Sequence, residues 1–228
     1  MIDSVRQATS IVLRHPFATG FLLVSLIFSA FIALDVRFGG KRALLEIFMF
    51  SPRRILYRKE IYRLISPFIY IQPMSFMIIL DVVLLYRAIV DIEDHFSGRR
   101  KSDFYKAVLF LASFIEIISS LLYLLPVNAR IRIRWLGGPL VISFIYFSSR
   151  LPLNRTAEIR WYGIIRLPVA YFPWIKLFTD AAKGTLEAIV GGLIGIFAGH
   201  LLYFFTIVVN DPEYQQARNA RRNLQPLH

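Results

Sequence analysis

Two acidic residues, Asp81 and Glu116, lie inside long apolar stretches of the sequence. A carboxylate at the centre of a membrane-spanning helix costs several kcal/mol unless it is paired, protonated or wetted. Two interpretations stay open for each residue. It is a neutralised or hydrogen-bonded carboxyl within a helix bundle, or it lines a polar membrane cavity that is open to water.

The composition indicates a membrane protein and excludes several kinds of chemistry. Of 228 residues, 56% are hydrophobic and 18% are charged, whereas soluble domains carry about a quarter charged residues. The net charge of +12 lies mostly between apolar blocks, so we expect membrane lipid as a partner and no nucleic acid. The chain has no cysteine, which excludes thiolate and cysteine–metal chemistry. We expect no cofactor and no metal.

Six apolar blocks predict an all-α integral membrane protein in which six transmembrane helices occupy residues 1–210. A helix needs roughly 20 residues to cross a hydrocarbon layer about 30 Å thick. The mixed stretch between the first two blocks suits a loop in the headgroup region. Residues 211–228 form a short polar tail. The predicted spans are Phe17–Leu34, Leu64–Val90, Phe104–Leu125, Trp135–Ser149, Trp161–Phe178 and Leu186–Val209.

Several groups of residues, in order along the chain, resemble motifs of the Derlin family, the rhomboid-like pseudoproteases of the endoplasmic reticulum. The resemblance covers roughly residues 50–205 and is densest just before the third predicted span. One departure is Tyr62, which stands where the family usually has Trp. The residues at the motif positions are Tyr62, Arg63, Arg87, Glu93, Gly98, Asp103, Gly137, Tyr171, Pro173 and Trp174.

This resemblance implies a rhomboid-like six-helix bundle in the endoplasmic reticulum membrane, with both termini cytosolic. It also implies a non-catalytic role: assisting retrotranslocation of misfolded client proteins for ubiquitin-dependent degradation. Family members engage a ubiquitin-ligase complex or adaptor, and some recruit an AAA unfoldase through a tail motif that contains Gly and Phe. Residues 211–228 contain neither, so we expect the unfoldase to be recruited indirectly. The segments on the two sides of the membrane carry equal numbers of Lys and Arg residues, so these numbers do not predict the orientation of the bundle.

An active intramembrane serine protease is the first alternative. Active rhomboids carry their serine in Gly-x-Ser-Gly at the start of the fourth span, where this chain has Pro139. The position of their histidine corresponds to Gly192. A displaced pair of Ser143 and His200 is disfavoured, because these residues lie about 6 Å and about 12 Å along their helices from Pro139 and Gly192. We therefore expect no catalytic residues and no enzyme.

The sixth predicted span carries a ridge of small residues, Gly191, Gly195 and Gly199. Glycines spaced four apart let another helix backbone approach closely. We expect this ridge to pack against the fourth span. His200, directly after the ridge, is interpreted as making an interhelical hydrogen bond.

A small proton-coupled transporter is the second alternative. In that protein a proton or substrate path would be lined by Asp81, Glu116 and His200. We find no inverted repeat in the sequence, which argues against it.

Overall fold

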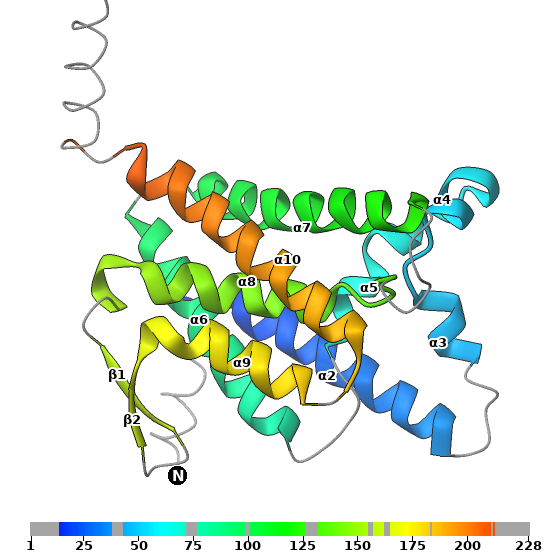
Figure 1. Cartoon of the computed structure of the whole chain (residues 1–228), viewed down its shortest axis with the longest axis horizontal. Coiled ribbons are helices and arrows are strands. Elements are labelled where there is room, and N and C mark those ends of the chain that lie inside the picture. Colours follow the sequence, from blue (N-terminus) through cyan, green and yellow to red (C-terminus); the bar gives the residue numbers. More distant parts are fainter. Residues whose placement is uncertain are drawn as a thin grey trace, which may run out of the picture.

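The computed structural model describes residues 14–37, 43–71, 77–98, 101–125, 132–154, 157–161, 165–182, 184–210 and 212. Six helices dominate the fold, and successive ones run in opposite directions, so that α2 begins and α10 ends at the same end of the bundle (Figure 1). The six are α2 (Pro16–Arg37), α6 (Met77–Ser97), α7 (Lys101–Leu124), α8 (Gly137–Arg150), α9 (Phe172–Ala181) and α10 (Leu186–Tyr203). The predicted tail lies outside the described residues apart from Pro212.

Three of the described helices are long and apolar enough to cross a membrane. They contain the stretches Pro16–Asp35, Ser102–Leu124 and Leu186–Val208. The last stretch continues past α10 into the π-helical turn η5 (Phe204–Val208). These helices agree with the predicted first, third and sixth spans and indicate a membrane protein.

The core is built around α8, which the flanking helices α6, α7, α9 and α10 surround (Figure 1). Twelve of its 14 residues are buried. A helix that is apolar on all sides is stable only when it is enclosed by others. Val141, Phe144 and Phe147, each at most 1% exposed, form the centre of the main hydrophobic cluster.

The predicted start of the second span is wrong. Helix α6 begins at Met77 rather than at Leu64, and it continues to Ser97. The stretch before it forms the short helices η1 (Ile61–Leu64) and α5 (Ser66–Ile69), because Pro67 begins a new helical turn and cannot continue an earlier one. The headgroup loop contains two more short helices, α3 (Ala43–Phe48) and α4 (Pro52–Arg58).

The predicted bounds of the fifth span are also wrong, although the described chain is mostly helical, as predicted. Strands β1 (Glu158–Trp161) and β2 (Ile165–Pro168) form an antiparallel hairpin in which Arg160 lies opposite Arg166. Apolar and charged residues alternate in both strands, which is the pattern of a strand. The turns η3 (Pro152–Asn154) and η4 (Val169–Tyr171) flank the hairpin. The α-helix that overlaps the predicted fifth span is α9, which has only ten residues.

Candidate functional site

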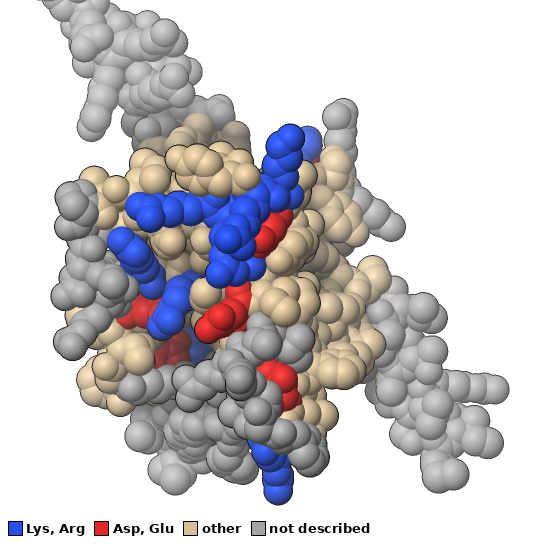
Figure 2. Space-filling model, turned by 90° about the vertical axis from the view of Figure 1, so that its right-hand side faces the viewer, with Lys and Arg blue, Asp and Glu red and all other residues tan. Residues whose placement is uncertain are grey.

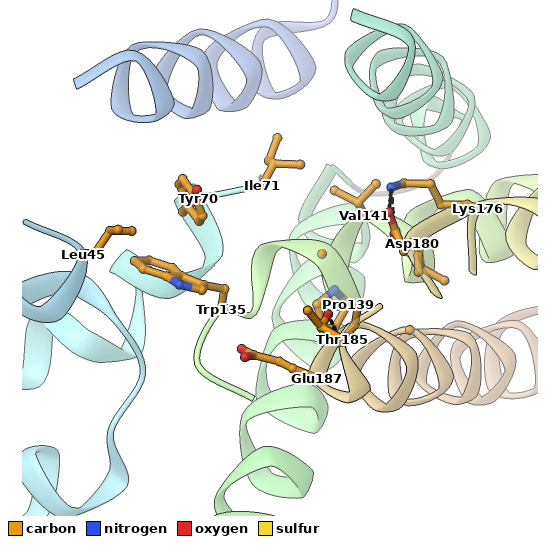
Figure 3. A pocket seen from close by; sticks show the side chains of 14 residues that line it. Leu45, Tyr70, Ile71, Trp135, Pro139, Val141, Lys176, Asp180, Thr185 and Glu187 are labelled. Carbon is orange, nitrogen blue, oxygen red and sulfur yellow. Dashed lines mark hydrogen bonds and ion pairs between the residues drawn. The ribbon is translucent and has the colours of Figure 1, made fainter. Parts of the chain in front are cut away.

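A cavity of about 400 Å³ lies at the end of the bundle where α8 and α10 begin. Tyr70 and Trp135 stand on one side of it, and Lys176 and Asp180 lie on the opposite side (Figure 3). The wall is mostly apolar, with few polar groups, as in many ligand pockets. The other lining residues are Leu45, Ile71, Gly138, Pro139, Val141, Ile142, Thr185, Glu187, Ala188 and Gly192.

Close backbone contact fixes the start of α8 beside this cavity. The Leu136 N–H donates to the Pro67 carbonyl over 3.0 Å. A Cβ atom at Gly137 would lie 2.2 Å from the Tyr70 carbonyl oxygen, so only glycine fits there. Gly137, one of the family-like residues, thus allows α8 to begin directly against the chain that follows α5.

The start of α10 is fixed by side chains. Thr185 caps the helix, because its hydroxyl accepts the Ala188 N–H over 3.3 Å. Glu187, in the first turn, accepts the Arg134 N–H over 2.6 Å and pairs with the Arg134 guanidinium at 3.4 Å. A carboxylate there is favoured by the helix dipole, and it holds the segment before α8 against α10.

Pro139 and Gly192 both line the cavity, so the positions that correspond to the protease serine and histidine belong to the same cavity. Among the described residues that line it, none is serine, cysteine or histidine. The hydroxyl of Thr185 is engaged in capping α10. The described wall therefore offers no serine or histidine for a dyad of the rhomboid type.

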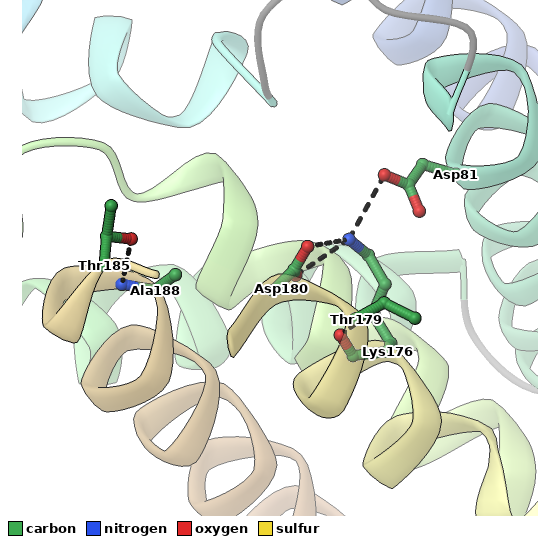
Figure 4. A network of polar contacts seen from close by, with 6 residues as sticks. All are labelled: Asp81, Lys176, Thr179, Asp180, Thr185 and Ala188. Atoms are coloured by element: carbon green, nitrogen blue, oxygen red, sulfur yellow. Dashed lines mark hydrogen bonds and ion pairs between the residues drawn. The ribbon is translucent and has the colours of Figure 1, made fainter. Parts of the chain in front are cut away.

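A buried triad of charges lies beside the cavity and links α6 to α9 (Figure 4). The Lys176 ammonium donates to both Asp180 oxygens, at 2.7 and 2.8 Å, and to Asp81 Oδ2 at 3.2 Å. The three residues are only 6–8% exposed. Asp81 is thus paired, and it reaches the cavity only through Lys176, which lines it. One buried ammonium balances one of the two carboxylates.

Lys176 and Asp180 were missed by the sequence analysis. They lie four residues apart, a spacing at which opposite charges meet on a helix, and an acidic residue inside an apolar block needs a partner. Those two signals together could have indicated an ion pair. The identity of the pair could not be predicted, because Lys176 is 95 residues from Asp81.

Glu116 lies on α7, which contributes no described residue to the lining of the cavity. Its Oε1 atom is buried and makes no hydrogen bond within the described part of the chain. Asp81, Glu116 and His200 therefore lie on three different helices, and each has different surroundings.

The three glycines of α10 face α8. A Cβ atom at Gly195 would lie 2.2 Å from the Pro139 carbonyl oxygen, and one at Gly199 would lie 2.8 Å from the Ser143 carbonyl oxygen. At Gly191 the nearest atom is the side-chain Cγ of Pro139, at 3.0 Å. The two backbones are therefore in contact along the ridge.

Ser143 and His200 each have another polar partner. The Ser143 hydroxyl donates to the Leu140 carbonyl over 2.7 Å, within its own helix. His200 Nδ1 lies 2.8 Å from the Tyr146 hydroxyl, a hydrogen bond between α10 and α8.

Arg63, the residue that carries the first family-like motif, is 1% exposed and anchors the headgroup loop. Its guanidinium donates to the carbonyls of Glu46 and Met49, at 3.0 and 2.7 Å, and pairs with Glu60. This hydrogen bond from Arg63 holds the pKa of the Glu60 carboxyl below its usual value. Tyr62 is half exposed, with its ring 5.4 Å from the Arg63 guanidinium.

The family-like residues around the α6–α7 junction have separate roles. Glu93 accepts the Phe17 N–H over 3.3 Å and lies 3.4 Å from His15, so it caps the start of α2 from another helix. Asp103, in the first turn of α7, pairs with Lys106 at 2.9 Å. Gly98 and Arg87 are exposed.

The last three family-like residues lie at the start of α9. Pro173 is buried in its first turn, a position that suits proline. Tyr171 and Trp174 are 59% and 47% exposed. Aromatic side chains with this exposure are typical of a membrane interface.

A second polar network, also missed from the sequence, joins α6, α8 and η3. Asp91 Oδ2 accepts hydrogen bonds from the Ser148 hydroxyl and the Asn154 side-chain amide, each over 2.8 Å. Asn154 is 5% exposed, and its amide also donates to the Ser148 carbonyl over 3.0 Å.

Comparison with known proteins gives one family. The sequence model of the Der1-like family matches residues 18–226. Derlin-1.2 of Zea mays is 29% identical over 72% of this chain and 63% of its own length. Derlin-1 of Arabidopsis thaliana is 31% identical over 69% of this chain and 55% of its own length. Derlin-2 of Oryza sativa subsp. japonica is 26% identical over 68% of this chain and 61% of its own length. The chain thus spans less than two thirds of these relatives.

Proposed function

Because the chain belongs to the Der1-like family, we propose that it is a non-catalytic, rhomboid-like membrane protein that assists retrotranslocation of misfolded proteins from the endoplasmic reticulum for ubiquitin-dependent degradation. The observation that carries this proposal is the cavity that Pro139 and Gly192 both line. This cavity lies beside the central helix α8, and its described lining contains no serine, cysteine or histidine. Such a chamber can hold a segment of client polypeptide instead of cleaving it.

The proposal includes six membrane passages. Besides the three long apolar helices, α6 has 21 residues and is long enough to span, whereas α8 has 14 and α9 has 10. At about 1.5 Å per residue the last two cover about 21 and about 15 Å. The alternating helix directions support this count (Figure 1).

In this arrangement, α9 is the short helix that we expect to thin the bilayer around it. Helix α8 is also short, but it is enclosed by its neighbours, so its length imposes nothing on the lipid. Helix α9 has Phe178 76% and Trp174 47% exposed. A short helix exposed to lipid is matched by a thinner bilayer, and thinning lowers the barrier to moving polar polypeptide across.

Filling the cavity tests this function. A Cβ atom at Gly138 would meet no atom within 4 Å, so Gly138→Leu adds a side chain into the open space. Because Gly138 precedes a proline, leucine there also strains the backbone, and Ala188→Leu fills the cavity from α10 without that strain. Gly20→Leu, on the open face of α2, is the matched control.

The readout is the half-life of a misfolded membrane-tethered client in cells that lack their own family members. We expect both cavity variants to accumulate normally but to lengthen the client half-life severalfold, whereas Gly20→Leu should not. Normal degradation with both filled variants would contradict a role for the cavity.

The localisation and the partners belong to the same proposal. Both termini are cytosolic, and a ubiquitin-ligase complex or adaptor binds the chain, with the AAA unfoldase recruited through it. A glycosylation sequon on a flexible extension after His228 should stay unmodified, and an endoglycosidase-sensitive gel shift would contradict the orientation. A pull-down in mild detergent followed by mass spectrometry should recover ligase subunits, and their absence would argue against that partner.

A further inference from the structure

The segment of residues 52–65, which we call the platform, exposes a large apolar surface. It contains α4 and η1, and its residues Leu56, Tyr57, Ile61 and Ile65 are 71%, 85%, 65% and 70% exposed. Exposure of an apolar patch formed by these four side chains to water is energetically unfavourable.

The same platform carries unbalanced positive charge. Arg53, Arg58 and Lys59 are exposed, and Arg54 is half-buried. The platform has a single acidic residue, Glu60, and the hydrogen bonds described for its carboxylate come from Arg63 and Tyr62. Four cations therefore stand beside the apolar patch with only one carboxylate among them, and that carboxylate is already engaged.

The platform is held rigidly on the bundle. The buried guanidinium of Arg63 binds carbonyls on and after α3, and the Ser66 hydroxyl donates to the Phe48 carbonyl over 3.0 Å. Ile55 packs against the main hydrophobic cluster. The exposed face is thus oriented by the fold before anything binds to it.

Its position is that of a membrane surface. Helix α4 lies at the end of the bundle where α2 and α7 end (Figure 1), and the apolar stretches of those helices end at Asp35 and Leu124. Figure 2 shows this end of the molecule, where Lys and Arg side chains gather. The two exposed tyrosines of the platform, Tyr57 and Tyr62, suit the headgroup level.

We propose that the platform docks into the leaflet at this end of the bundle and binds the phosphates of anionic phospholipids. The apolar side chains enter the boundary between headgroups and acyl chains, as in interfacial helices. The four cations then face the headgroups, where each Lys or Arg strengthens binding to an anionic surface. A zwitterionic leaflet would leave that charge unbalanced. The inference stands on the platform alone and does not need the retrotranslocation proposal.

The absence of cysteine allows a site-specific test. The full-length chain with Tyr57→Cys carries an environment-sensitive fluorophore and is reconstituted into phosphatidylcholine vesicles with one fifth phosphatidylserine. Quenching is measured with acyl-chain spin-labelled phosphatidylserine and, separately, with equally labelled phosphatidylcholine. We expect several times stronger quenching by the serine lipid. The preference should fall to near equality of the two lipids in R53Q/R54Q/R58Q/K59Q, since each surface cation strengthens binding to an anionic surface.

Two controls test whether the positive charges of the platform cause the lipid preference. Arg166→Gln, on the hairpin, removes an exposed charge elsewhere and should leave the preference unchanged. High salt should abolish the preference in the parent chain through screening, which tests the idea even where the fourfold variant is unstable. Equal quenching by the two lipids in the parent chain overturns the proposal and leaves the cations to an acidic protein partner. A preference that survives both the charge removal and the salt also overturns it.

Discussion

The contact between α8 and α10 and the contact between α6 and α9 stabilise the same bundle by opposite means. Helices α8 and α10 make the most extensive contact in the described structure, and it depends on glycines that bring the backbones together. Helices α6 and α9 have little backbone contact. They are joined by the buried Lys176 ammonium between Asp81 and Asp180.

This difference predicts opposite sensitivities. The α8–α10 contact depends on glycines, so it has no room for an added side chain. Few charged groups take part in it, so removal of a charge should have little effect on it. A contact made by an ion triad tolerates changes of shape, yet removal of the Lys176 ammonium takes from Asp81 and Asp180 the buried cation that they share. The cavity lies between the two contacts, since Pro139 and Gly192 belong to the first and Lys176 and Asp180 to the second.

The largest effect is expected from Gly195→Leu. The first added carbon would already lie 2.2 Å from the Pro139 carbonyl oxygen, and backbone cannot move aside as a flexible side chain can. Overpacking by single methylenes costs about 1–3 kcal/mol, and leucine adds four heavy atoms. We expect folded protein to be lost, measured as the monodisperse fraction in gel filtration after mild detergent extraction.

A series of alanine variants refines this prediction. The loss of thermal stability should decrease from Gly195→Ala to Gly199→Ala to Gly191→Ala, in the order of the distances 2.2, 2.8 and 3.0 Å and of the change from backbone to side-chain neighbours. Gly20→Ala should be neutral or stabilising, because alanine is a better helix former. If all four variants behave alike, helix propensity rather than backbone contact decides the stability.

The glycine contact could be predicted from sequence, and the ion triad could not. A ridge of glycines four residues apart is a local pattern, and so are the apolar blocks that predicted α2, α7, α8 and α10 within a few residues. Asp81 was recognised as a residue in need of explanation, but its partner lies on an element that was itself assigned wrongly. Counting apolar residues over 161–178 hid the alternation of Ile165, Arg166 and Leu167, and with it the hairpin that shortens α9.

The next effect in size is expected from Lys176→Met. Methionine nearly keeps the volume but leaves Asp81 and Asp180 as buried carboxylates without their cation. Breaking a buried ion pair in this way costs about 3–5 kcal/mol. Asp81→Asn should cost less, about 1–2 kcal/mol, because the shorter contacts of Lys176 to Asp180 remain. Thermal denaturation of the purified chain in detergent measures both.

The combined variant Asp81→Asn, Lys176→Met, Asp180→Asn provides the control. With all three charges removed, no buried ion lacks a partner, and the stability should recover most of the loss caused by Lys176→Met alone. Failure to recover would mean that the side-chain volume or hydrogen bonds of the triad, rather than its charge, join α6 to α9. The two contacts would then not differ in kind.

The smallest effect is expected from Tyr146→Phe, which removes the hydroxyl that meets His200 at 2.8 Å. This hydrogen bond crosses the same α8–α10 contact as the glycine ridge. A single hydrogen bond contributes about 1 kcal/mol net. We therefore expect a loss of that size in thermal denaturation, and a similar loss for His200→Phe. The double variant should lose little more than either single one, since both remove one bond. A loss as large as that of Lys176→Met would mean that α8 and α10 also depend on a polar link, and backbone contact would no longer distinguish the two regions.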